Sequence, residues 1–172
     1  MSDDKYVVGI DYGTLSGRAI IVRVSDGEEM GSAVKEYTHA VMDKALTAHK
    51  HEPLPPDYAL QYPEDYIEVL KIAVPEAIRE SGVDPKDIIG IGTDFTSATV
   101  MPTDVSGWPL CMRREFADHI HAYVKLWKHH GAQAEADKII DTGRIDVGIE
   151  GDSRVMSPRA FRSPLLQRTA QG

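Results

Sequence analysis

Cysteine is almost absent from this sequence of 172 residues, which has a single one at position 111. One cysteine cannot form a disulfide within the chain, so the fold has to be stable without a covalent cross-link. The sequence also lacks a charged leader followed by an apolar stretch, and it has no uninterrupted run of about 18 apolar residues. These absences predict a soluble, reduced, cytoplasmic protein that does not span a membrane.

Positive charge is scarce as well, because 19 lysines and arginines face 27 acidic residues, for a net charge of −8 at pH 7. A sequence-independent grip on nucleic acid phosphates requires a basic surface, so the charge balance argues against nucleic acid as the main ligand. It is compatible with an enzyme that binds anionic ligands through a few local backbone amides.

The first part of the chain predicts three antiparallel strands. Val, Ile and Tyr dominate residues 5–11 and 18–24, and Gly13 and Gly17 supply the bend between these two runs. A third strand is expected at 33–38, after an Asp-Gly turn signal.

A loop and a helix are expected next. Residues 43–61 include "HEPLPP", with three prolines in six positions, which is too many for a regular element. Apolar residues then recur near the helical period from 63 to 82, where Gly82 ends the helix. Pro75 lies inside this run and should kink or divide it.

The second half predicts a buried strand around 88–91, a further strand at 97–102 and a helix at 120–140. Strands followed by alternating strand and helix predict an α/β fold with a mixed sheet. Residues 139–172 contain five arginines, no lysine and no regular apolar pattern, which predicts an irregular segment.

The bend between the first two strands carries the chemistry of greatest interest. It contains an acid, small residues and hydroxyls: Asp11, Gly13, Thr14, Ser16 and Gly17. Glycines let backbone amides point at phosphate oxygens, hydroxyls add donors, and a carboxylate at a strand end can hold a hydrated Mg²⁺. The same residues also fit a tight hairpin with local turn bonds, and spacing alone leaves these two interpretations equal.

Two other patterns carry less weight. The stretch "GIGTDF" at 90–95 lacks the third glycine and the following helix of a dinucleotide fingerprint. Three close histidine pairs occur, but with one cysteine and no metalloprotease spacing they favour solvated side chains over a zinc site.

Three motifs in a fixed order resemble those of the FGGY carbohydrate kinases, and within that family those of the ribulokinases. They are "GIDYGTLSGR" at 9–18, "GIGTDFTSAT" at 90–99 and "HAYVKLWKHHGAQ" at 121–133. The resemblance covers about residues 5–138 and is more specific than any one glycine loop. It implies an actin-like ATPase fold, which has two RNase H-like lobes. Residues 1–138 would form the first lobe, an α/β unit with a mixed sheet flanked by helices. Residues 139–172 would form a divergent tail.

The resemblance also implies a reaction. Members of this kind transfer the γ-phosphoryl group of ATP to the 5-hydroxyl of L-ribulose in L-arabinose breakdown, and they require Mg²⁺. Two alternatives stay open: a sugar or nucleotide half-site without catalysis, and a kinase of another pentulose or of glycerol. The "KLWKHH" segment argues against the second, because those kinases more usually have a Trp-x-Asp-x-Arg pattern there.

Matching residue by residue, Asp11 corresponds to the family's metal-associated aspartate. Gly13, Thr14 and Ser16 correspond to its phosphate-facing turn. Arg18 stands where a cation could meet phosphate charge, although a surface salt bridge explains it equally well.

The sugar side of the resemblance rests on two segments. Thr96 and Ser97 lie in the bend that approaches the sugar, where relatives often have Ala-Cys after the threonine in place of Ser97-Ala98. Trp127 and Lys128 lie in the "KLWKHH" segment, which in the family borders the sugar site, and an indole there could supply an apolar wall and an N–H donor. The alternative for Trp127 is an ordinary core position on a helix.

The resemblance stops near residue 138. The family's general-base aspartate and its adenosine-binding second lobe have no counterpart in this sequence, so no residue is assigned as the catalytic base. We therefore expect a truncated product, with the change in arginine usage suggesting a frame shift, that is inactive or nearly so alone.

Overall fold

The computed structural model describes residues 4–146. Two compact units meet in the sequence between Gly131 and Ala132, and the described residues are 4–131 of the first unit and 132–146 of the second. The predicted irregular segment lies outside the described residues from 147 onwards. No helix among the residues described is long and apolar enough to cross a lipid bilayer.

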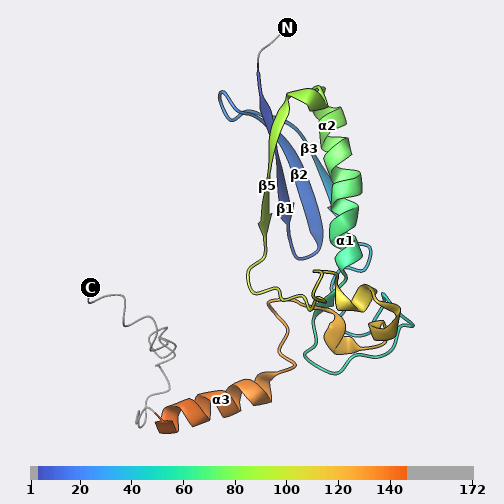
Figure 1. The fold of residues 1–172 in the computed structure, drawn as a ribbon, viewed down its shortest axis with the longest axis vertical. Helices are drawn as coiled ribbons and strands as arrows, with labels where there is room; N and C mark the ends of the chain where they lie inside the picture. Colours follow the sequence, from blue (N-terminus) through green and yellow to red (C-terminus); the bar gives the residue numbers. More distant parts are fainter. Residues whose placement is uncertain (1–3, 147–172) are drawn as a thin grey trace, which may run out of the picture. The chain divides into compact units, whose positions relative to one another are not determined.

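The first unit contains a four-stranded mixed sheet (Figure 1). Its strands are β1 (Tyr6–Tyr12), β2 (Ser16–Arg23), β3 (Glu29–Glu36) and β5 (Ile88–Phe95), in the order β3-β2-β1-β5. The β1–β2 and β2–β3 pairs are antiparallel, whereas β1 and β5 are parallel. The mixed sheet and the three predicted antiparallel strands are confirmed, with the third beginning earlier than expected.

One helical rod packs on a single face of this sheet (Figure 1). It consists of α1 (Pro63–Glu68), a π-helical turn η1 (Val69–Ala73) and α2 (Val74–Ser81), and Gly82 ends it in the left-handed conformation, with φ 66°. Pro75 lies in the first turn of α2, directly after the π-helical turn. A proline has no N–H and its ring displaces the carbonyl four residues earlier, so the predicted division of the helix at Pro75 is confirmed.

The sheet and the rod bury a shared apolar core, in which Ile10, Ala19 and Ile21 meet Val69 and Ala77. Contact between the two layers is close at Gly17. A Cβ added there would lie 2.4 Å from Val69 Cγ2, so only glycine lets η1 approach β2 this closely.

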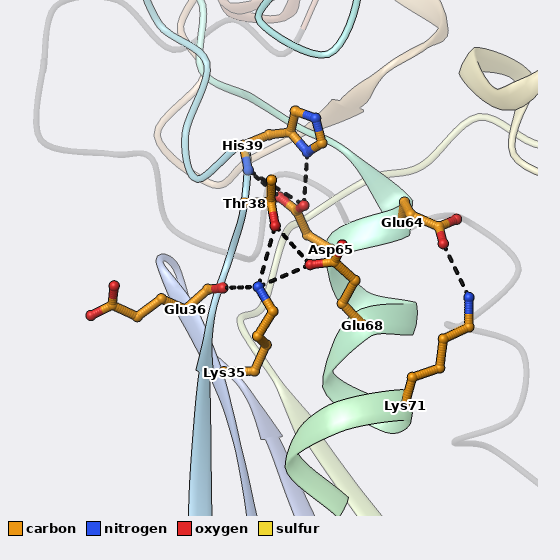
Figure 2. A network of polar contacts seen from close by, with 8 residues as sticks. All are labelled: Lys35, Glu36, Thr38, His39, Glu64, Asp65, Glu68 and Lys71. Carbon is orange, nitrogen blue, oxygen red and sulfur yellow. Dashed lines mark hydrogen bonds and ion pairs between the residues drawn. The ribbon is translucent and has the colours of Figure 1, made fainter.

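A polar network joins the end of β3 to the first turn of α1 (Figure 2). The Asp65 carboxylate is 1% exposed and accepts hydrogen bonds from the His39 backbone N–H at 3.1 Å and, at 2.8 Å, from His39 Nδ1. Lys35 Nζ lies 2.9 Å from a Glu68 oxygen, and Thr38 donates its hydroxyl to the same carboxylate. The chain leaving β3 is therefore anchored to the helix.

A second apolar cluster lies within the first unit, built from irregular segments that include Met42, Leu46, Cys111 and Tyr123. The two-residue strands β4 (Leu60–Gln61) and β6 (Val124–Lys125) pair antiparallel beside it. Short 3₁₀ turns complete the unit: η2 (Pro85–Asp87), η3 (Leu110–Met112), η4 (Arg114–Phe116) and η5 (Ile120–Ala122).

Three predictions for the second half are wrong in part. Residues 120–132 form η5, β6 and turns in place of a helix, because pairing with β4 and burial of the segment override helix propensity. The helix α3 is Gln133–Asp146, so it continues past residue 139. No strand forms at 97–102, where Val100 makes an isolated bridge to Lys125 and Ala98 has φ 57°, outside the extended region.

The strand around 88–91 exists but is not buried. Ile89 is 62% and Ile91 68% exposed. The reason is topological, since β5 is an edge strand and the helical rod packs on the residues of β1 and β2.

Candidate functional site

A hollow of about 480 Å³ lies on the sheet around the carboxyl-terminal half of β1, and we call it the sheet hollow. Its lining residues are Gly9, Ile10, Asp11, Arg18, Ile20, Glu29, Gly92, Thr93 and Asp94. Asp11 is paired with Arg18 of the neighbouring strand β2 and with Asp94 of the neighbouring strand β5. Because directly paired residues project their side chains to the same face, one guanidinium and two carboxylates emerge together there.

Asp94 is a site residue that the sequence did not reveal. The sequence predicted a strand only around 88–91, which left Asp94 beyond its end, and it contained no sign that β5 would pair with β1 in this register. Two neighbouring carboxylates fit Mg²⁺, which binds through one or two carboxylates and keeps several waters. An adjacent arginine fits a phosphate group.

The turn between β1 and β2 follows directly from Asp11. Gly13 N–H donates to the Ser16 carbonyl at 2.9 Å, and an added Cβ at Gly13 would lie 3.1 Å from that oxygen. Gln61 Nε2 donates to the Thr14 carbonyl at 2.8 Å, and Tyr37 N–H donates to the Leu15 carbonyl at 2.9 Å. The turn is therefore held by its own hydrogen bond and by two groups from outside it.

A smaller cavity of about 230 Å³ opens beside this turn, and we call it the turn hollow. It is lined by Tyr12, Gly13, Gln61, Tyr66, Phe95, Thr96, Thr99, Met101 and Val124. Thr96 Oγ1 lies 2.9 Å from Thr99 Oγ1, and Thr96 N–H donates to the Tyr12 carbonyl at 3.3 Å. The structure thus brings Gly13 and Thr96 together, while Ser97 is exposed and lines neither hollow.

Trp127 reaches the turn from a distant part of the sequence. Its Nε1 lies 3.5 Å from Thr14 Oγ1, at the outer limit of a hydrogen bond. The side chain is 57% exposed and follows β6 in a turn, so the alternative of a core tryptophan on a helix is wrong. Lys128 is half-buried and lines neither hollow.

Burial keeps two phenol groups that line the turn hollow, and one thiol in the second apolar cluster, protonated. It raises the pKa of the Tyr66 phenol far above its ordinary value, and that of Tyr12 in the same direction. In the second apolar cluster, burial raises the pKa of the Cys111 thiol to about 11, so this thiol is a packing group and no nucleophile at neutral pH.

Solved structures with the same arrangement are sugar kinases. A gluconate kinase from Lactobacillus acidophilus superposes with a TM-score of 0.61 at 14% identity, over 84% of this chain and 24% of that one. A xylulose kinase from Rhodospirillum rubrum gives 0.58 at 18% identity, over 80% of this chain and 23% of that one. Over the matched residues the chain thus shares the fold of part of these sugar kinases.

Sequence comparison is more specific, although no protein-family model matches the chain. A ribulokinase from Mycolicibacterium smegmatis is 57% identical over 135 residues, which are 78% of this chain and 24% of the relative. A ribulokinase from Bacillus licheniformis is 55% identical over 125 residues, or 73% of this chain and 22% of the relative. Over the matched residues the chain is similar to these ribulokinases, and it spans about a quarter of the length of these curated relatives.

Proposed function

We propose that this chain supplies the first lobe of a kinase that transfers the γ-phosphoryl group of ATP to the 5-hydroxyl of L-ribulose. The observation that carries the proposal is the position of Gly13, which belongs to the strand-connecting turn and also lines the turn hollow with Thr96. The phosphate-binding turn and the sugar pocket would then lie next to each other, with Gly13 belonging to both. Identity to ribulokinases is 57% and 55%, against 18% and 14% for xylulose and gluconate kinases, which favours L-ribulose.

On the nucleotide side, Asp11 and Asp94 would hold a hydrated Mg²⁺ bound to the phosphates of ATP. The turn formed by Gly13, Thr14 and Ser16 would present backbone amides and hydroxyls to phosphate oxygens. Arg18, which shares the sheet hollow with both carboxylates, would neutralise phosphate charge. Phosphoryl transfer depends on such positioning and charge neutralisation more than on covalent chemistry by the protein.

On the sugar side, Thr96 would donate or accept a hydrogen bond with a hydroxyl of the sugar from within the turn hollow. The exposed indole of Trp127 would cover an apolar C–H face of the sugar. Ser97 and Lys128 remain proposed contacts of the same substrate, and each would have to turn toward the pocket when the sugar binds.

The proposal assigns no general base to this chain. The remaining three quarters of the relatives' length would supply the base and the adenosine-binding lobe. Within this chain we place the kinase lobe at 1–138 and treat 139–172 as a separate tail.

A chimaera tests the proposal directly. Residues 1–131 of this chain replace the segment with which they align in the Mycolicibacterium smegmatis ribulokinase, and we refer to this protein as the chimaera. With Mg·ATP it should phosphorylate L-ribulose in preference to D-xylulose, whereas the 172-residue chain alone should show no turnover. A folded chimaera that prefers D-xylulose, or robust turnover by the isolated chain, would contradict the proposal.

A further inference from the structure

We infer that Gln61 is a positioning residue for the phosphate turn, fixing the direction of the backbone amide at its tip. The inference rests on the proposed function, because it concerns how that turn meets a nucleotide. Gln61 ends the short strand β4 and is 1% exposed. Its Nε2 donates to the Thr14 carbonyl at 2.8 Å, across 47 positions of sequence.

The Gln61 amide is held in one orientation. The Tyr66 hydroxyl donates to Gln61 Oε1 at 2.8 Å, so the amide oxygen is used and the NH₂ group faces Thr14. Tyr66 is itself fixed by edge-to-face contacts with the rings of Tyr12 and Tyr37, with centroids 5.9 and 5.7 Å apart. Two side chains, Tyr66 and Gln61, thus connect the helical rod to the carbonyl of the turn.

Anchoring this carbonyl has a consequence for the next amide. In a trans peptide the C=O and the following N–H point in opposite directions, and the described residues contain no cis peptide bond. Because the Thr14 carbonyl points toward buried Gln61, the Leu15 N–H points away from it. Leu15 as a residue is 59% exposed, and a phosphate oxygen that approaches the turn on the side away from Gln61 could accept from this N–H.

The Leu15 carbonyl is held separately, by the Tyr37 N–H at 2.9 Å. The peptide between Thr14 and Leu15 therefore depends on Gln61, whereas the next peptide does not. Loss of the Gln61 donor should free one peptide plane of the turn without dismantling the hairpin. Because Gln61 also lines the turn hollow, the expected signature is a defect in nucleotide use that is larger than any defect in sugar binding.

Gln61→Glu in the chimaera tests this assignment. The substitution keeps volume and the acceptor for Tyr66, but it places a carboxylate oxygen against the Thr14 carbonyl. At about pH 8 the KM for ATP should rise about 10-fold, the worth of one hydrogen bond, and this rise should exceed the change in the KM for L-ribulose. Near about pH 6 protonation of the introduced carboxyl restores a donor, and the defect should shrink.

Tyr66→Phe is the matched control, because it removes the hydrogen bond to Oε1 and leaves the Nε2 donor in place. Its effect on the KM for ATP should be smaller and should not depend on pH in this way. Equal losses in both KM values, or an unchanged KM for ATP in Gln61→Glu, would overturn the inference.

Amide hydrogen exchange of the 172-residue chain provides a test that needs no activity. In Gln61→Glu the Gly13 amide, which closes the turn, should exchange at least about 10-fold faster, while the Val8 amide in β1 keeps its protection. Unchanged exchange at Gly13 would overturn the inference. If the unsubstituted chimaera fails to phosphorylate L-ribulose, the proposed function fails, and this measurement still decides the role of Gln61.

Discussion

Asp11 in β1 lies directly opposite Asp94 in the parallel strand β5, and both side chains line the sheet hollow. Neighbouring strands are about 4.8 Å apart, so two carboxylates in this register repel each other unless a cation lies between or beside them. Arg18 lies in β2, the strand on the other side of β1, and supplies one positive charge. A divalent metal would supply the rest.

Replacing either acid should weaken metal use. In the chimaera, Asp11→Asn and Asp94→Asn should each raise the Mg²⁺ concentration for half-maximal activity by at least about 10-fold, since each removes a charged oxygen ligand. Steady-state rates over a Mg²⁺ titration measure the effect. Glu115→Gln, an exposed acid of η4, serves as the control. An Asp94 variant that behaves like the control would exclude Asp94 from the metal site.

Gly17→Ala should destabilise the chain by about 2 kcal/mol, because overpacking a closely fitted core has about this cost. The new methyl would lie 2.4 Å from Val69 Cγ2. Urea unfolding followed by circular dichroism measures the change. Gly92→Ala is the matched control in a strand, because nothing lies within 4 Å of the added Cβ and the change should stay within about 0.5 kcal/mol.

Val69→Ala offers a second check on the same contact. It removes the atoms that the Gly17 methyl would strike, so the double variant should be more stable than the sum of the single effects predicts. Strict additivity would show that Gly17 is required for another reason.

Asp65→Ala should lower the free energy of unfolding by about 2 to 3 kcal/mol, since it leaves two half-buried donors of His39 without their acceptor. Glu64→Ala, one position earlier in the same turn, breaks only an exposed ion pair with Lys71 (Figure 2) and should cost no more than about 0.5 kcal/mol. Chemical denaturation of both variants gives the comparison. Similar losses would mean that the Asp65 contacts contribute little.

Glu68 should make stability depend on acid pH. The hydrogen bond from Lys35, followed by that from Thr38, lowers the pKa of Glu68 below its ordinary value of 4.5. A carboxyl with a lowered folded-state pKa contributes its stability above the unfolded pKa, and this contribution is lost as pH falls through the folded pKa. The difference in unfolding free energy between the unsubstituted chain and Glu68→Gln should therefore be largest near about pH 6.5. It should disappear as pH falls below 4.5, where Glu68 becomes protonated.

Denaturation at a series of pH values measures this difference. Glu76→Gln, in an exposed pair with Arg79, is the control and should show a smaller change over the same range. A Glu68 variant whose stability difference does not change with pH would contradict the prediction.

Local signals in the sequence were sufficient to predict most of the secondary structure of the first 82 residues. The β-branched runs before and after the glycine bend gave β1 and β2, and Pro75 and Gly82 gave the division and the end of the helical rod. These features depend on backbone chemistry within a few residues, so they can be read without knowing the partners. The three family-like motifs predicted the fold by resemblance, and the similarity to sugar kinases agrees with that prediction.

Long-range pairing decided what the sequence left open or predicted wrongly. Residues 120–132 have helix-forming side chains, yet Val124 pairs with Gln61, so this part of the segment forms the strand β6 beside β4 and no helix. The register of β5 on β1 brought Asp94 to Asp11, and the packing of β4 brought Gln61 to Thr14. The sequence by itself determined which segments extend, turn and coil; only tertiary structure decided which side chains meet, because those contacts join residues tens of positions apart.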